Sequence, residues 1–185
     1  MDIILFGIQG SGKGTQAKIL AEKFQLKPFE MGAQLRTLAQ ENSELSLKVK
    51  TLIEAGHLVP ADIVIEIAEK FIQKLQPGEK ALFDGIPRNI EQKEKFDAVL
   101  KKYHRDFLGI QIEIPEEETI KRLLARGRND DTPEGIKNRI DHFNRQTLPI
   151  IEDYKKSGKI VCVNGFQNVE EVAAEIMNKL NSSVN

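Results

Sequence analysis

The residues best suited to chemistry are a glycine-rich loop and a cluster of arginines. The loop, GIQGSGKGTQ, runs from Gly7 to Gln16, after a short apolar run and before an amphipathic segment. Its G-x-x-x-x-G-K spacing lets backbone N–H groups and a helix N-terminus surround a phosphate, to which Lys13 adds a full positive charge. The residue after the lysine is Gly14, and the hydroxyl that often ligates magnesium comes one place later, at Thr15. The pattern predicts that a phosphate is bound by Gly10, Ser11, Gly12, Lys13, Gly14 and Thr15.

Five of the eight arginines fall between positions 122 and 145. Arg122 and Arg126 are four residues apart, so on a helix both guanidinium groups reach the same phosphate chain. The formal net charge is only −1, which removes the general electrostatic case for binding nucleic acid or an acidic membrane surface. The clustering therefore predicts a focused anion site. Such a site suits phosphoryl transfer, which needs in-line positioning and neutralisation of negative charge more than covalent work by the protein.

Length and composition predict one globular α/β domain. The chain has 185 residues, of which 40% are hydrophobic and 30% charged, values close to the globular average. No apolar run approaches the roughly 18 residues that a membrane span needs. The single cysteine, Cys162, cannot form an internal disulfide or a cysteine-based zinc site. We expect a soluble cytoplasmic protein.

Short apolar runs alternate with longer segments of helical period, which is typical of strand-helix-strand units around a parallel sheet. Strands are expected at residues 3–6, 27–30, 81–83, 107–114 and 160–163. Within the fourth run, Ile110 and Ile112 alternate with Gln111 and Glu113. This alternation predicts that one face of that strand is wetter than the other.

Helical spacing predicts the helices that cover this sheet and their buried faces. One stripe consists of Ala17, Leu20, Ala21 and Phe24, and another of Ile63, Ile67, Phe71 and Leu75. Thr132 is expected to cap a helix that begins at Pro133 and continues through Tyr154, and Asn168 is expected to cap the last helix. Residues 31–59 interrupt the alternation with two helix-like pieces, which predicts an inserted helical lobe.

Ligands of open parallel sheets bind outside the carboxyl ends of the strands. Gly7, Met31, Asp84, Pro115 and Asn164 end or follow the five expected strands, so these segments should converge on one edge. Asp84 is the expected holder of Mg²⁺ through water, because hard oxygen ligands suit that ion. The alternative is that Asp84 caps the following turn.

Six stretches carry a resemblance to a known family. The chain resembles the nucleoside monophosphate kinases, and the adenylate kinases among them most closely, over essentially its whole length. The resemblance implies a P-loop NTPase three-layer sandwich with a five-stranded parallel sheet, formed by a single kinase domain at residues 1–185. It also implies an inserted NMP-binding lobe at residues 30–59. The stretches are GIQGSGKGTQ, GAQLR (32–36), EAGHLVPADIV (54–64), DGIPRNIEQ (84–92), RLLARGRNDD (122–131) and KNRI (137–140).

The same resemblance implies the ligands and the roles of individual residues. The ligands are ATP, AMP and ADP, with Mg²⁺ accompanying ATP, and the chain is expected to act as a monomer without nucleic-acid or membrane partners. The catalytic cations are Lys13, Arg88, Arg122, Arg126, Arg128 and Arg139. Besides the loop, ATP is expected to contact Arg122, Arg126 and the backbone of Gln167. AMP is expected to contact Met31, Arg36, His57, Leu58, Val59, Gly85, Ile86, Pro87, Arg88, Gln92, Arg128 and Arg139, with His57 contributing its backbone.

The chain departs from the family pattern in the acceptor segment and in the lid. Met31-Gly32-Ala33 stands where adenylate kinases have Thr-Gly-Asp, which removes a hydroxyl and a carboxylate. Residues 126–132 form only a vestigial lid, and no zinc site is expected. A lid excludes water from the reactive phosphate, so its shortening is expected to permit slow hydrolysis of ATP.

Two other functions remain open at this point. Asn89 resembles the UMP/CMP-type kinases, whereas the amide of Gln92, which can both donate and accept, matches the edge of adenine. The second alternative is a catalytically weak nucleotide-binding regulatory protein. The preferred prediction is an adenylate kinase that maintains the balance of adenine nucleotides through ATP + AMP ⇌ 2 ADP.

Overall fold

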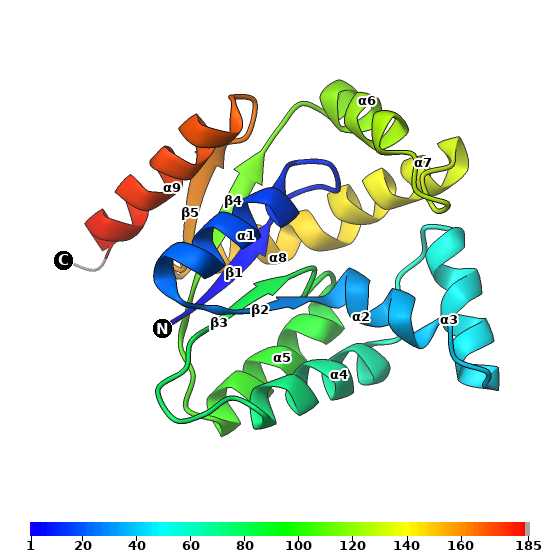
Figure 1. Cartoon of the computed structure of the whole chain (residues 1–185), viewed down its shortest axis with the longest axis horizontal. Helices are drawn as coiled ribbons and strands as arrows, with labels where there is room; N and C mark the ends of the chain where they lie inside the picture. Colours follow the sequence, from blue (N-terminus) through cyan, green and yellow to red (C-terminus); the bar gives the residue numbers. More distant parts are fainter. Residues whose placement is uncertain (184–185) are drawn as a thin grey trace.

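Five parallel strands form the centre of the molecule. The computed structural model describes residues 1–183, and its sheet has the order β2-β3-β1-β4-β5 (Figure 1). Each bound lies within one residue of the predicted strand, so all five strand predictions are confirmed. The strands are Asp2–Phe6 (β1), Lys27–Glu30 (β2), Ala81–Asp84 (β3), Phe107–Glu113 (β4) and Ile160–Asn164 (β5).

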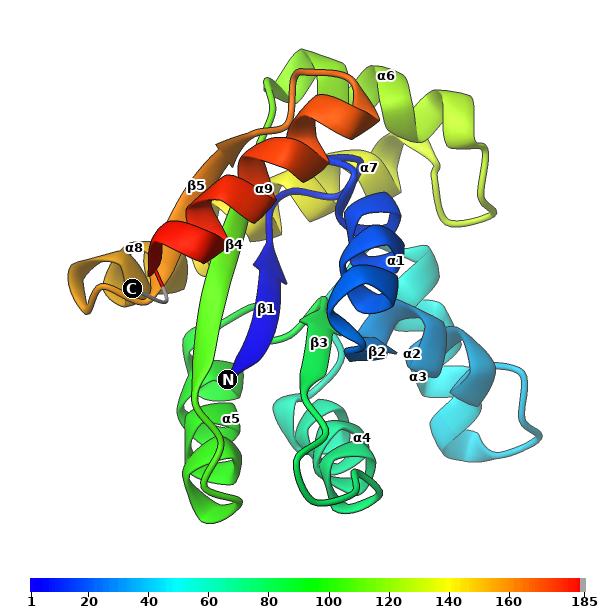
Figure 2. The same ribbon diagram turned by 60° about the vertical axis from the view of Figure 1, so that its left-hand side comes forward.

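Helices cover both faces of this sheet and complete a three-layer α/β fold (Figures 1 and 2). Helices α1 and α9 lie on one face, and α4, α5 and α8 lie on the other. None of the helices within residues 1–183 is long and apolar enough to cross a membrane. The helices are α1 (Lys13–Phe24), α2 (Met31–Leu38), α3 (Glu44–Glu54), α4 (Ala61–Gln73), α5 (Ile90–Lys102), α6 (Glu116–Arg126), α7 (Pro133–His142), α8 (Leu148–Lys156) and α9 (Val169–Ser183).

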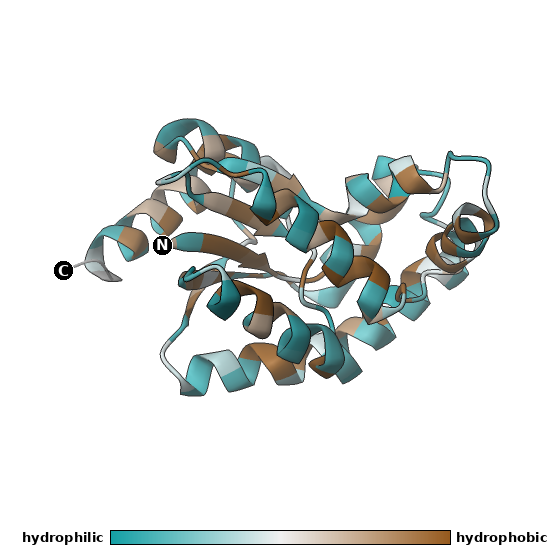
Figure 3. Ribbon diagram, turned by 90° about the horizontal axis from the view of Figure 1, so that it is seen from below, coloured by the Kyte–Doolittle hydropathy of each residue, from teal (hydrophilic) through white to brown (hydrophobic). Residues whose placement is uncertain are grey.

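The central strand β1 divides the core into two layers. Ile4 and Phe6 pack into the cluster shared with α4, α5 and α8, whereas Ile3 and Leu5 pack into the cluster shared with α1 and α9. Successive side chains of a strand point to opposite faces, so a strand covered on both faces must be apolar at nearly every position. In Figure 3, the strand that follows the N-terminus is brown over most of its length.

The predicted helix caps are confirmed. The Thr132 side-chain oxygen accepts a hydrogen bond from the N–H of Gly135 at 3.0 Å. The Asn168 side-chain oxygen accepts one from the N–H of Glu171 at 2.9 Å. Both side chains satisfy an N–H group that the first turn of a helix leaves unpaired.

The single helix predicted from Pro133 through Tyr154 is wrong, because a π-helical turn interrupts it. This turn, Phe143–Thr147 (η1), separates α7 from α8. Pro149 lies just beyond it, and a proline inside a helix lacks an N–H and clashes with the carbonyl four residues earlier. A wider turn relieves such a clash, and π-helical turns are frequent at functional sites. Here the turn directs Phe143 and Thr147 into the cleft described below.

Three predicted burial patterns also need correction. Phe24, the last member of the α1 stripe, is 36% exposed because α1 ends there. Of the predicted wetter face of β4, Glu113 is exposed, but Gln111 is only 4% exposed, and the Cys162 thiol lies 3.6 Å from its side-chain oxygen. The stripe predicted for α4, namely Ile63, Ile67, Phe71 and Leu75, is only partly buried at the edge of the core, because α4 packs against both α5 and α2. The fully buried face of α4 consists of Ala61, Val64, Ile65, Ala68 and Ile72.

Helices α2 and α3 project beside the edge of the sheet as the predicted helical insertion (Figures 1 and 2). The insertion touches α7, since the side-chain amide of Asn138 donates to the carbonyl of Ala55 at 2.8 Å. The backbones approach closely there, and a Cβ on Gly56 would lie 2.5 Å from the carbonyl oxygen of Gly135. Gly56 also has a φ of 73°, so glycine is required for both reasons.

A buried ion pair fixes the amino-terminal end of the sheet. Asp2 is 2% exposed and accepts two hydrogen bonds from the Arg105 guanidinium, both at 2.6 Å. It also accepts the N–H of Ala81 at 2.8 Å, which links β1 to β3. Removing one partner of a buried pair leaves the other charge uncompensated.

We expect Asp2→Ala to lower the free energy of unfolding by about 3 kcal/mol, because it strands the Arg105 charge. Urea unfolding measures the change. Asp62→Ala is the control, since Asp62 pairs with Lys95 but its side chain is 85% exposed, and such pairs contribute about 1 kcal/mol or less. Equal losses in the two variants would contradict the role given to Asp2.

Candidate active site

A cleft of about 580 Å³ lies at the carboxyl ends of the strands. Its volume falls within the roughly 300–1,000 Å³ of pockets that bind small molecules and cofactors. All the site residues predicted from the sequence line this cleft, except Ser11 and Gln167. The fold therefore brings together segments that are far apart in the chain.

The glycine-rich loop forms one wall of the cleft. Lys13 Nζ donates to the carbonyls of Gly7 at 2.8 Å and Ile8 at 3.0 Å, which closes the loop on itself. A Cβ on Gly7 would lie 2.5 Å from the carbonyl oxygen of Ile112, so only glycine fits. Gly12 precedes α1 in a left-handed conformation, with a φ of 96° and no heavy atom within 4 Å of the position of a Cβ. The start of α1 is thus open to an anion.

Ser11 and Gln167, the two predicted site residues that do not line the cleft, have contacts elsewhere. Ser11 is 3% exposed, and its N–H donates to the carbonyl of Ile8 at 3.1 Å, so that N–H is already used. The side-chain amide of Gln167 donates to the carbonyl of Asn164 at 2.9 Å and to Glu175 at 2.8 Å. These contacts hold Gln167 against its own loop and α9.

Two arginines form another part of the wall of the cleft. Arg88 Nε donates to the carbonyl of Gly85 at 3.0 Å, and the Arg88 carbonyl accepts the hydroxyl of Thr147 at 2.8 Å. Burial lowers the pKa of Arg88, against the opposing effect of Asp84. Arg36, from α2, donates to Glu30 at 2.9 Å. Both guanidinium groups line the same cleft as the loop.

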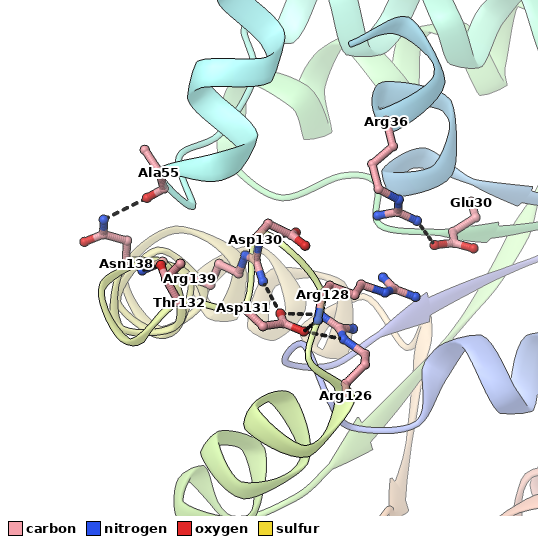
Figure 4. A network of polar contacts seen from close by, with 11 residues as sticks. Glu30, Arg36, Ala55, Arg126, Arg128, Asp130, Asp131, Thr132, Asn138 and Arg139 are labelled. Atoms are coloured by element: carbon pink, nitrogen blue, oxygen red, sulfur yellow. Dashed lines mark hydrogen bonds and ion pairs between the residues drawn. The ribbon is translucent and has the colours of Figure 1, made fainter. Parts of the chain in front are cut away.

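Three more arginines gather around the turn between α6 and α7: Arg126 at the end of α6, Arg128 in the turn and Arg139 in α7. Asp131, in the same turn, lies at the centre of their contacts (Figure 4). The fully buried Asp131 carboxylate accepts two hydrogen bonds from Arg126, at 2.8 and 2.7 Å, and one from Arg139 at 2.9 Å. It also accepts the N–H of Arg128 at 3.1 Å, and Arg139 reaches Asp130 as well. Burial would raise the pKa of Asp131, but the hydrogen bonds from Arg126 and from the Arg128 N–H hold it below its usual value.

The remaining cations of the cleft differ in their partners. Arg122 Nε donates to Glu118 at 2.7 Å, and its guanidinium lies 3.5 Å from the carbonyl oxygen of Gly165. Among residues 1–183, no side chain or carbonyl accepts a hydrogen bond from the Arg128 guanidinium, and burial lowers the pKa of Arg128. The Arg128 guanidinium can therefore donate to an anion, although Glu30 and Asp130 partly offset its charge.

Asp84 fits a hydrated magnesium ion. It ends β3, is 8% exposed and lines the cleft, and within the described residues its carboxylate has neither a hydrogen bond nor an ion pair. Burial raises the pKa of Asp84, while the charges of Lys13 and Arg88 act in the opposite direction. An unpartnered carboxylate beside phosphate-binding cations suits a hard, water-retaining cation. Residues 1–183 contain no group of three or more His, Cys, Asp or Glu side chains placed to hold a metal directly.

The amide of Gln92 is partly used by the protein. Gln92 is 2% exposed, and its oxygen accepts the N–H of Arg88 at 2.9 Å. Its own N–H donates to the side chain of Asn89 at 2.8 Å, which caps α5. One of the two lone pairs of the Gln92 oxygen is therefore used by the protein, and within residues 1–183 the side-chain NH2 has no acceptor and can donate to a ligand.

Several residues that line the cleft were not singled out from the sequence, including Glu30, His142, Phe143 and Thr147. His57 Nδ1 and His142 Nε2 lie 3.2 Å apart, so the imidazole of His57, which was predicted to contribute only its backbone to the AMP pocket, links residues 31–59 to α7. Glu30 belongs to the predicted strand end and could have been found there. His142, Phe143 and Thr147 depend on the π-helical turn, for which the sequence has no clear signal.

The glycine-rich loop and the arginines line one cleft, an arrangement suited to phosphorylated ligands. Because one wall is a P-loop at the edge of a parallel sheet, the fold and the cleft define a P-loop phosphotransferase. The family model described as adenylate kinase matches residues 5–159. The chain belongs to the adenylate kinase family.

Similar proteins named adenylate kinase include some of about the same length as this chain and a longer one. The adenylate kinase of Phenylobacterium zucineum is 38% identical over 181 residues, covering 95% of each chain. That of Leptospira biflexa serovar Patoc is 34% identical over 183 residues, covering 96% of this chain and 98% of the relative. The alignment with the adenylate kinase of Chloroherpeton thalassium, at 34% identity, extends over 216 residues and covers 99% of both chains, so that relative has segments absent here. A short chain is thus common to several members.

The charge of Lys13 generates a pH prediction. Burial lowers the pKa of Lys13 to about 8, although the charge of Asp84 opposes the shift. The side chain is therefore charged below pH 8 and neutral above it, while a polyphosphate binds the charged form. Above this pKa, protonating Lys13 costs about 1.4 kcal/mol for each pH unit, which is a factor of ten in affinity. We therefore expect the Kd of ATP to rise about tenfold between pH 7 and pH 9.

Calorimetric titration with ATP across this pH range measures the effect. Lys13→Arg is the matched variant, because its guanidinium stays charged and should remove most of the rise. A wild-type affinity that stays constant to pH 9, or an equal rise in Lys13→Arg, would show that Lys13 does not titrate as described.

Proposed function

We propose that this chain transfers the terminal phosphoryl group of ATP reversibly to AMP, forming two molecules of ADP and thereby balancing the adenine nucleotides. The observation that carries the proposal is the placement of Lys13 and its loop together with Arg36 and Arg88 in one cleft of an adenylate kinase family member. Phosphoryl transfer needs this arrangement, because two anions must approach within bonding distance despite their repulsion.

The donor side is assigned to the loop and α6. Backbone N–H groups at the start of α1 and the Lys13 ammonium are suited to the β- and γ-phosphates of ATP. Arg122 and Arg126, one turn apart on α6, extend the positive surface along the same phosphate chain. Bound Mg²⁺ would neutralise part of the phosphate charge, and Asp84 would hold it through water.

The acceptor side is assigned to the wall formed by Arg36 and Arg88. Arg36 and Arg88 are suited to bidentate hydrogen bonds with the AMP phosphate. The free amide N–H of Gln92 is suited to an acceptor nitrogen of adenine. Apolar and backbone groups complete the pocket for the nucleoside: Met31, Leu58, Val59, Gly85, Ile86 and Pro87.

The reaction itself requires no base from the protein. The AMP phosphate is already ionised near neutral pH, so one of its oxygens attacks the γ-phosphorus of ATP directly. The new O–P bond forms as the bond to the β-phosphate oxygen breaks, and ADP leaves. Lys13, Arg128 and Arg139, which line the cleft, would stabilise the charge that spreads over the transferred group.

We also propose that residues 30–59 serve as the acceptor lobe and residues 126–132 as a vestigial lid. The lid would be the tight turn around Asp131, supported by the contact network of Figure 4. The chain would act as a monomer in the cytoplasm on nucleotides alone, since a single chain supplies both walls of the cleft and carries a net charge of −1.

Incubation with Mg·ATP and each nucleoside monophosphate in turn tests the proposal. All nucleotides are followed by chromatography, with ATP alone as the control. ADP formed rapidly with AMP, and far more slowly with CMP or UMP, is the expected result. Preference for CMP or UMP would make the chain a pyrimidine nucleotide kinase, and no transfer to any acceptor would leave only nucleotide binding.

We expect Gln92→Leu to reduce the preference for AMP over CMP, as a ratio of kcat/KM, by roughly tenfold to a hundredfold. The variant loses the amide that donates to the base, and an unpaired hydrogen-bonding group costs about 1–3 kcal/mol. Steady-state kinetics with both acceptors measures the ratio. Asn89→Ala is the control, because it removes the side chain that accepts the Gln92 backbone N–H but keeps the Gln92 amide. An unchanged ratio in Gln92→Leu would mean that Gln92 does not read the base.

A further inference from the structure

The side chain of Glu30 lies between the two halves of the cleft. It ends β2, lines the cleft and accepts a hydrogen bond from Arg36 Nη2 at 2.9 Å (Figure 4). The pair is only half-buried, with side-chain exposures of 36% for Arg36 and 47% for Glu30. An ion pair this exposed is weak and can be exchanged for a stronger one.

Glu30 is paired with Asp84 by the register of the sheet. The two residues lie directly opposite each other at the carboxyl ends of β2 and β3. Neighbouring strands are about 4.8 Å apart, and opposed residues point to the same face. That face is the one covered by α1, because Leu82, two residues before Asp84, packs with Ala17 and Leu20 of α1. Two carboxylates therefore stand side by side next to the phosphate loop, and that of Asp84 has no partner within residues 1–183.

The charge of Glu30 acts across the whole cleft. Its electrostatic effect reaches groups of the loop, the strand ends and the turn after α6, namely Lys13, Asp84, Arg88, Arg126 and Arg128. A phosphate dianion binds an arginine more strongly than a carboxylate does, through two charge-assisted hydrogen bonds. An acceptor phosphate would therefore displace Glu30 from Arg36 and leave a carboxylate beside Asp84 and the donor phosphates. A hard cation with bound water is the partner that such a carboxylate requires.

We propose that Glu30 is an exchangeable carboxylate, held by Arg36 in the free chain and joining Asp84 around the hydrated Mg²⁺ of ATP once the acceptor phosphate occupies Arg36. This inference rests on the proposed function. It makes Glu30 a positioning residue that couples acceptor binding to metal binding. Removing the Glu30 carboxylate should therefore strengthen the binding of AMP and weaken the binding of the metal.

The first consequence concerns the acceptor. Glu30→Gln removes the internal competitor for Arg36, so we expect the Kd of AMP, titrated calorimetrically without ATP or metal, to fall about twofold to fivefold. This is the range of a half-exposed ion pair. The control is Glu66→Gln, which breaks an exposed ion pair with Lys70, one turn along α4 and outside the cleft. It should leave the AMP affinity unchanged.

The second consequence concerns the metal. Mn²⁺, followed by electron paramagnetic resonance, is titrated into the protein saturated with AMP and the β,γ-imido analogue of ATP, which prevents turnover. We expect Glu30→Gln to weaken Mn²⁺ binding about tenfold, the lower end of the loss seen when a group that orients metal ligands is removed. The Glu66→Gln control should bind Mn²⁺ as the wild type does.

Both results are required. An AMP affinity that is unchanged or weaker in Glu30→Gln would overturn the exchange at Arg36, and an unchanged Mn²⁺ affinity would overturn the metal role. A wild-type chain that binds no AMP at all would instead refute the proposed function, so the two failures are distinguishable.

Discussion

Repulsion among the cations of the cleft is the constraint on which the rest of the structure depends. Seven arginine and lysine side chains assigned to phosphate binding line the cleft. Two charges 4 Å apart near a protein surface repel each other by about 4 kcal/mol. Without countercharges, these side chains would turn away from each other into solvent. The fold opposes this with carboxylates paired to the arginines: Asp131 with Arg126 and Arg139, Asp130 with Arg139, Glu118 with Arg122, and Glu30 with Arg36.

Backbone geometry places these groups as much as charge does. The parallel sheet brings the loop after β1 and the ends of β2 and β3 to one edge, so Lys13, Glu30 and Asp84 face each other. On the other side, the turn between α6 and α7 is short enough for one buried carboxylate to hold two arginines. The π-helical turn brings the Thr147 hydroxyl to the carbonyl of Arg88, which fixes the acceptor wall. The turn itself thus keeps Arg126 and Arg139 ordered.

Local features of the sequence predicted most of this architecture. The strands, the loop and the caps at Thr132 and Asn168 were predictable because each depends on a few adjacent residues. The residues around the cleft were predictable only where a family motif contains them, as for Arg88. The π-helical turn was not predictable, since it depends on how a helix containing Pro149 packs. Nor could the sequence show that the Gln92 oxygen is used by the Arg88 N–H, or that Gln167 is tied to Glu175, because these are tertiary contacts.

The central claim is that Asp131 preorganises the arginines that act on the transferred phosphate. The most direct test is the kcat for ADP formation in Asp131→Asn, which keeps the shape of the side chain but removes its charge. The account predicts a loss of about a hundredfold at temperatures where circular dichroism shows the variant folded, because small displacements of charged groups have effects of that size. Asp130→Asn, which touches only Arg139, should lose much less. A kcat for Asp131→Asn equal to that of Asp130→Asn or of the wild type would contradict the account.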